Sequence, residues 1–302
     1  LTEANLAQIY NHTRFLIRNN NAPVQELLIQ GMGAVARGFA YWQVSAAFPL
    51  EIIDEDGAGP MDYWPYWNIR NANEFIEGMR NSDYAPDYIK QKVSEARYLR
   101  AHEYFQMVKR YGGVPIITEP QDIDAPREEL FVARDSEQEV YDFIASEMDE
   151  IASLLPEDAE PGRVDKYTAL ALKSRAMLYA ASVAEFGEVQ MDGLLGIPAG
   201  EADEYWQASY DASMEIVESG NFALYNKNPD DPAQNFQNLF VDPDNPERIF
   251  VEVYDPSIEK GHSWNLGATP FETRETWGSN FCPFLNIIEE FEYADGTPGT
   301  ID

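Results

Sequence analysis

The chain has 302 residues, 44% of them hydrophobic and 13% aromatic, which suits a folded protein with a substantial core. Its formal net charge of −32 leaves no basic stripe for phosphates, which argues against binding to nucleic acid or directly to anionic lipid. The single cysteine, Cys282, excludes an intrachain disulfide and a cysteine metal cluster.

Two apolar segments open the chain. Residues 2–19 are predicted to form a helix, and residues 24–47 form a second apolar segment. Within the second, Gly31, Gly33 and Ala36 match the G-x-G-x-x-A spacing of a dinucleotide-binding turn. Helical patterns without strand–helix–strand alternation follow, so we do not predict a nucleotide site.

Residues 51–66 are predicted to form an acidic, glycine-rich loop. Asp54 and Asp56 give only the beginning of a calcium-binding pattern, because the closing bidentate glutamate is missing. A solvated acidic turn is therefore favoured, a Ca²⁺ ion is not supported, and no cofactor is predicted. A helix is expected to follow over residues 67–79.

The longest helix signal covers residues 87–111. Apolar residues form two stripes along it, which indicates a helix packed on two sides rather than one surface stripe. Pro86 suits the first turn, and Gly112 and Gly113 are expected to end the helix. The chain then leaves in a strand-like run, residues 114–118.

Three further helices are predicted after a connector rich in proline and acidic residues. Ser136 and Glu139 form a capping box, which starts a helix extending to residue 155. Asp165 is a suitable N-cap for a helix over residues 166–186. Another helix is expected over 203–218.

The pattern changes after residue 220. Residues 221–285 are rich in Asn, Asp, Pro, Gly and aromatic residues, and lose the helical period. One β-like run, residues 248–254, interrupts them. The prediction is thus a helical scaffold over 1–220 and a loop-rich region over 221–302.

No catalytic residue or metal ligand is predicted. The histidines His12, His102 and His262 are widely spread, and none belongs to a known catalytic or metal motif. The chain has 53 Asp and Glu residues, so no carboxylate pair can be selected without distances.

Tryptophans in irregular segments are better candidates for a binding site. A sugar ring can cover an exposed indole face while neighbouring polar side chains bind its hydroxyls. The candidate residues for glycan binding are Trp64, Trp264, Asn265, Arg274, Trp277 and Asn280. The alternative is that these tryptophans plug the core. Trp42, Trp67 and Trp206 lie on helical patterns and are expected in the core.

Five phrases of the chain, in order, resemble the SusD/RagB family of outer-membrane glycan-binding lipoproteins. The first two are YWNIRNANEFIEGM and EARYLRAHEYFQMVKRYGGVPIIT. The next two are YDFIASEMDEIASLLPE and GRVDKYTALALKSRAMLYAAS, and the last is IIEEFEYADGTP. The phrases are specific as a set, and the resemblance extends over most of the chain, from residue 66 to residue 298.

The resemblance implies a mainly α fold: a tetratricopeptide-like helical superhelix with an inserted loop-rich region containing short β-strands. It also implies a single domain over residues 1–302, incomplete at its C-terminus. Such proteins are held at the cell surface by an N-terminal lipid, which this chain does not contain. They bind oligosaccharide without catalysis and partner a SusC-like TonB-dependent barrel transporter. Two alternatives remain open, a helical glycoside hydrolase and a helical-repeat interaction scaffold.

Overall fold

A computed structural model describes residues 2–13, 36–38, 63–254, 257, 281–293 and 295–300. The chain divides into two compact units. The first comprises Leu1–Thr13 and Trp64–Val253, and the second comprises Arg14–Tyr63 and Tyr254–Asp302. The expected single domain stays a prediction.

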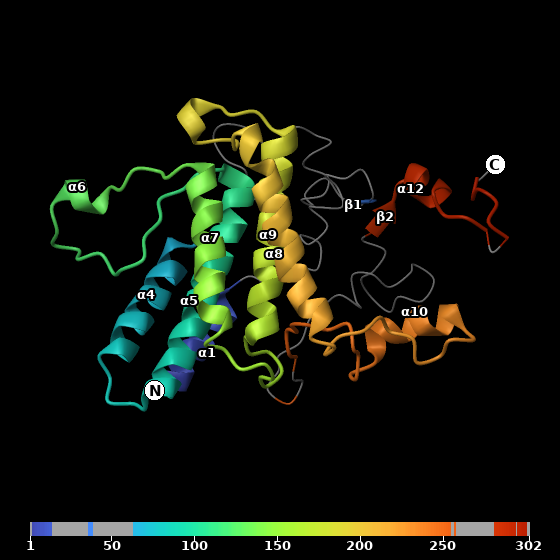
Figure 1. Ribbon diagram of the computed structural model, residues 1–302, viewed down its shortest axis with the longest axis horizontal. Helices are drawn as coiled ribbons and strands as arrows, with labels where there is room; N and C mark the ends of the chain where they lie inside the picture. Colours follow the sequence, from blue (N-terminus) through green and yellow to red (C-terminus); the bar gives the residue numbers. More distant parts are fainter. Residues whose placement is uncertain are drawn as a thin grey trace. The chain divides into compact units, whose positions relative to one another are not determined.

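Helices build the first unit. The long ones are α1 (Thr2–His12), α4 (Tyr66–Arg80), α5 (Pro86–Tyr111), α7 (Glu137–Ala152), α8 (Lys166–Phe186) and α9 (Ala202–Glu218). Short elements follow α5, α8 and α9: α6 (Arg127–Leu130), η3 (Met191–Gly193), η4 (Ala199–Glu201) and α10 (Pro232–Val241). Helices α4, α5, α7, α8 and α9 pack as successive neighbours, and α1 packs on both α4 and α5 (Figure 1). The predicted mainly helical, tetratricopeptide-like fold is confirmed.

Helix α5 is buried on two sides, as its two apolar stripes predict. Five of its side chains are fully inaccessible: Ala96, Leu99, Ala101, Tyr104 and Met107. The helix starts with Pro86 in its first turn and ends at Gly112, whose φ of +66° favours glycine. A Cβ on Gly113 would collide with the carbonyl oxygen of Asp135, so the chain needs a second glycine there.

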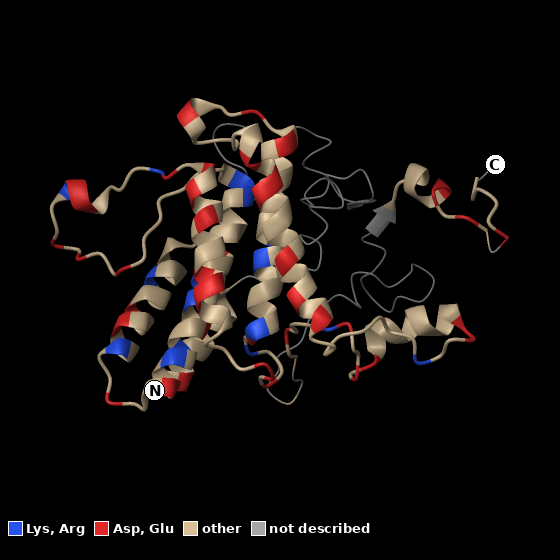
Figure 2. Ribbon diagram, viewed as in Figure 1, with Lys and Arg blue, Asp and Glu red and all other residues tan. Residues whose placement is uncertain are grey.

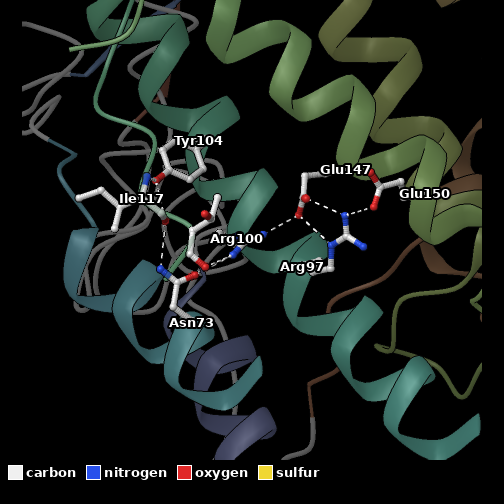
Figure 3. Close-up of polar contacts among 8 residues, drawn as sticks. Asn73, Arg97, Arg100, Tyr104, Ile117, Glu147 and Glu150 are labelled. Carbon is white, nitrogen blue, oxygen red and sulfur yellow. Dashed lines mark hydrogen bonds and ion pairs between the residues drawn. The ribbon is translucent and has the colours of Figure 1, made fainter. Parts of the chain in front are cut away.

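The run 114–118 after α5 is not the predicted strand. Its backbone groups bond to side chains instead. Asp135 accepts a hydrogen bond from the Ile116 amide at 2.6 Å, and the Tyr104 hydroxyl accepts one from the Ile117 amide at 2.7 Å. Asn73 of α4 donates to the Ile117 carbonyl at 3.0 Å (Figure 3). Because side chains satisfy these groups, the segment needs no neighbouring strand.

A buried ionic network joins α5 to its neighbours (Figure 3). Arg97 donates two hydrogen bonds to the Glu147 carboxylate of α7, at 2.7 and 3.1 Å. Arg100 donates to the same carboxylate at 2.8 Å, to Asn73 Oδ1 at 2.7 Å and to the Thr118 carbonyl at 2.9 Å. Arg100 therefore ties α5 to α7, α4 and the 114–118 segment at once. Burial alone would raise the pKa of Glu147, but the two arginines outweigh it and hold that pKa below 4.5.

Opposite charges lie on neighbouring helices of this unit (Figure 2). Helices α7 and α9 contain Asp and Glu but neither Lys nor Arg, whereas α5 and α8, which flank α7, carry basic residues. Further ion pairs follow this pattern, such as Lys173 of α8 with Asp149 of α7 at 2.6 Å. The large negative charge of the chain is thus partly compensated at the helix contacts.

Several predicted boundaries need correction. Among the described residues the first helix ends at His12, and the rest of its predicted range, residues 14–19, lies outside them. Helix α7 ends at Ala152, three residues before the predicted end, although its capping box at Ser136 and Glu139 is confirmed. Asp165 caps α8 as predicted, accepting a hydrogen bond from the Thr168 amide.

Two predictions for the loop-rich region are wrong. Helix α10 was not predicted, although Asp231 accepts a hydrogen bond from the Gln234 amide as its N-cap and Pro232 occupies its first turn. The Asn- and Pro-rich composition obscured these signals. The run 248–254 is not a strand.

The second unit contains a two-stranded antiparallel sheet. Strand β1 (Ala36–Gly38) pairs with β2 (Phe281–Pro283), with Arg37 opposite Cys282. The short helix α12 (Leu285–Glu289) follows β2. Across the described residues of both units, every helix is too short or too polar to cross a bilayer.

The network predicts a large stability loss for Arg100→Met. The substitution leaves Glu147 buried with one arginine and orphans the Asn73 and Thr118 oxygens, which should cost about 3 kcal/mol of unfolding free energy. Denaturant unfolding measures it. Lys90→Met is the control. The ion pair between Lys90 and Asp87 is exposed, so this substitution should lower the free energy of unfolding by less than about 1 kcal/mol. Equal losses would contradict the role of the network.

Acid should weaken the same network. The lowered pKa of Glu147 means that its stabilisation is complete above pH 4.5 and is lost as pH falls through the folded-state pKa. Glu147→Gln should therefore be less stable than the parent at neutral pH, and the gap should shrink in acid. Unfolding free energies measured from pH 7 down to 3 test this. A gap independent of pH would contradict it.

Candidate functional site

Trp64 lies immediately before α4, and about half of its side-chain surface is open to solvent. Its relative exposure is 52%. Pro65 occupies the N-cap position of α4 directly after it, without a capping side chain. The fixed φ of proline restricts the backbone at the point where the chain enters the helix.

Two tyrosines brace the Trp64 ring. Tyr111, the last residue of α5, meets it edge to face with ring centroids 5.2 Å apart. Tyr66, in the first turn of α4, lies at 5.1 Å in a tilted arrangement. Aromatic contacts of this kind add about 0.5–1.5 kcal/mol each beyond area burial. The exposed indole is therefore held in place rather than free to rotate.

Hydrogen bonds in turn fix Tyr66. Its hydroxyl donates to the Pro115 carbonyl at 2.6 Å, which attaches it to the segment held by the network of Figure 3. Burial raises the pKa of Tyr66 well above its ordinary value, so its hydroxyl stays a donor at any physiological pH. Tyr66 and Tyr111 were not among the predicted site residues. Their positions at helix ends flanking Trp64 were the available signal.

This arrangement suits an apolar, planar contact. A rigid, half-open indole offers its face to a ligand that has its own apolar face, such as the C–H side of a sugar ring. With half of its surface exposed, Trp64 does not plug the core, and its role as a glycan platform stays a prediction.

The other five candidate residues lie outside the described residues. They are Trp264, Asn265, Arg274, Trp277 and Asn280. Their grouping with Trp64 remains a prediction.

The expectation that the helical tryptophans are core residues is wrong for Trp67. Its side chain is 52% exposed, because the buried side of α4 is formed by residues such as Ile69, Ala72 and Ile76. Trp206 is half-buried and donates from its indole nitrogen to Glu185 at 2.7 Å. Trp42 lies outside the described residues.

Within the described part of the chain, His, Cys, Asp and Glu side chains form no group of three or more that could hold a metal ion. Asp54 and Asp56, which begin the calcium-like pattern, fall outside that part.

Solved structures of low sequence identity share this fold. A SusD-like protein from Bacteroides fragilis matches with a TM-score of 0.73 and 23% identity, over 99% of this chain and 54% of its own. A SusD-like carbohydrate-binding protein from the same species gives 0.72 and 23%, with the same coverage. A SusD superfamily protein from Parabacteroides distasonis gives 0.71 and 19%, over 97% of this chain and 60% of its own. The chain thus spans little more than half of the length of these proteins.

Among curated proteins no match is found. A family model does match, over residues 5–178, which is more than half of the chain. The model is that of the SusD-like proteins described as starch-binding and associating with the outer membrane. The chain therefore belongs to the SusD-like family.

Proposed function

We propose that this chain is the glycan-binding part of a cell-surface lipoprotein. In this proposal it captures oligosaccharide and delivers it to a SusC-like TonB-dependent barrel transporter in the outer membrane. Binding occurs without covalent chemistry. The observation that carries the proposal is the half-exposed Trp64 ring braced by Tyr66 and Tyr111, in a chain of the SusD-like family.

The aromatic support favours saccharide over a charged ligand. A stacked sugar gains mainly from dispersion and from burial of its C–H face, and neither depends on the sign of the surface charge. Asn265, Arg274 and Asn280 are proposed to bind the sugar hydroxyls, with Trp264 and Trp277 as further platforms. The net charge of −32 would disfavour acidic glycans over neutral ones at low ionic strength.

Helix packing gives the platform a stable base. The Trp64 ring contacts α5 through Tyr111 and α4 through Tyr66, and these two helices are bonded to each other through Arg100 and Asn73. A rigid site loses little side-chain entropy on binding, so more of the contact energy appears as affinity.

Trp64→Ala should weaken oligosaccharide binding about thirtyfold while leaving the fold intact. Loss of a central stacking contact commonly costs 2 kcal/mol or more. The melting temperature should stay within a few degrees, because half of the side chain is already exposed. Calorimetric titration with the oligosaccharide that binds best on a glycan array measures the affinity.

Phe186→Ala serves as the matched control. Phe186 is an aromatic side chain of the same unit with 75% exposure, at the end of α8. Its removal should leave affinity unchanged. Normal binding by Trp64→Ala would remove Trp64 from the site, and release of reducing ends from the bound oligosaccharide would show an enzyme instead.

The transporter should co-purify with the protein from native membranes. The contact is expected to exceed the roughly 1,000 Å² of a specific interface. Pull-down from gently solubilised membranes, followed by mass spectrometry, should recover an outer-membrane barrel. Recovery of soluble partners alone would favour an interaction scaffold and contradict this part of the proposal.

A further inference from the structure

A cleft lies between α1 and α4, within the first unit. Its volume is about 270 Å³, and it is lined by Asn5, Gln8, Ile9, Asn71, Glu74 and Phe75. The two helices run antiparallel beside it (Figure 1). Thr13, just after α1, accepts a hydrogen bond from Asn68 in the first turns of α4 at 3.2 Å, which fixes their pairing at that end.

Three carboxamides line this cleft. Asn5 and Gln8 lie one turn apart on α1, and Asn71 lies across from them on α4. Among the described residues, none of the three side chains has a hydrogen-bond partner, whereas the nearby Asn68 and Asn73 are both engaged. Each carboxamide offers both donors and an acceptor to a ligand.

The floor of the cleft is apolar and its charge is balanced. Ile9 and Phe75 form this floor and are 3% and 9% exposed. Arg70 donates a hydrogen bond to the Glu74 carboxylate at 2.7 Å and forms an ion pair with it. The negative charge of Glu74 is therefore already compensated. No described lining residue carries a positive charge, so the cleft holds nothing that would attract an anion.

An exposed tryptophan precedes the cleft-lining residues of α4. Trp67 lies one helical turn before Asn71 on α4. Its ring meets His12, one turn after Gln8 on α1, edge to face at 4.7 Å. His12 contacts the indole while 52% of the Trp67 side chain stays open.

We infer that this cleft is a second saccharide-binding site, for one or two neutral sugar rings. The carboxamides would bind vicinal hydroxyls, which need both donors and acceptors. The Trp67 face would cover the C–H side of the ring nearest the end of the cleft. The volume lies just below the roughly 300 Å³ at which sites for drug-sized ligands begin, which limits the ligand to a short unit. The inference rests on the proposed glycan-binding function and adds a site to it.

Side-chain carboxamide and indole resonances report on this site directly. Maltose and laminaribiose, both neutral disaccharides, are titrated into ¹⁵N-labelled protein while the signals of Asn5, Gln8, Asn71, Trp64 and Trp67 are followed. The expected result is that the four cleft residues shift together along one binding curve. Trp67→Ala, and separately the double variant Gln8→Ala with Asn71→Ala, should weaken that curve about tenfold.

Gln190→Ala is the matched control, because Gln190 is an exposed carboxamide between α8 and α9 whose side chain is not part of the cleft. It should leave the curve unchanged. Circular dichroism checks that each variant folds. If Trp67→Ala does not fold, the double variant still tests the site.

The outcomes separate the two proposals. If oligosaccharide binds and shifts the Trp64 resonance while the cleft resonances do not move, the inference of a saccharide site in the cleft is overturned and the proposed function stands. If neither calorimetry on an oligosaccharide panel nor any resonance detects binding, both are overturned. If digalacturonate shifts the cleft signals at lower concentration than the neutral disaccharides, the assignment to neutral sugars is overturned.

Discussion

The burial of Arg100 is the constraint on which the rest of the first unit depends. A guanidinium with 5% exposure requires fixed partners, because an unpaired charge in that position would cost several kcal/mol. Its partners come from α4, α7 and the segment after α5. Three pieces of chain distant in sequence are thereby placed around one side chain. Hydrophobic burial alone would hold these helices together without fixing how they slide against each other.

The same constraint reaches the exposed ring of Trp64. Asn73 and Tyr104 hold the 114–118 segment, and that segment accepts the hydrogen bond that orients Tyr66 beside Trp64. The buried ion pairs thus fix the position of a loop, the loop fixes a tyrosine, and the tyrosine supports an exposed ring. The exposed indole thus gains its rigidity from buried groups that do not contact it themselves.

Local signals in the sequence predicted the helices well and the surfaces poorly. Caps at Ser136 and Asp165 mark helix starts because a cap depends only on the next three residues. The two-sided burial of α5 follows from its apolar spacing. Whether residues 114–118 become a strand depends instead on which side chains reach them, and Asn73 and Tyr104 are distant in sequence or on another element. Periodicity cannot supply that information.

The tryptophans show the same limit of sequence patterns, which do not give contacts between helices. Trp67 was predicted in the core because it lies in a helix, although its position opposite Ile69, Ala72 and Ile76 on the helical wheel was readable. Trp64 was singled out because it lies in the loop before the helix, and its ring is half-exposed. The partners of both rings, Tyr111 for Trp64 and His12 for Trp67, come from other helices. Family phrases predicted the fold, and only contacts between helices show which rings are open.

The corner at Gly112 and Gly113 has a consequence for the order of folding. The Gly113 amide donates to the Leu194 carbonyl at 2.7 Å, which joins the end of α5 to the connection between α8 and α9. Helix pairs such as α7 with α8 can form from contacts between near neighbours in sequence, which are quick to find. The corner must wait for a much longer loop to close. We therefore expect the corner beside Trp64 to be completed late in folding, after the helices that carry it have paired.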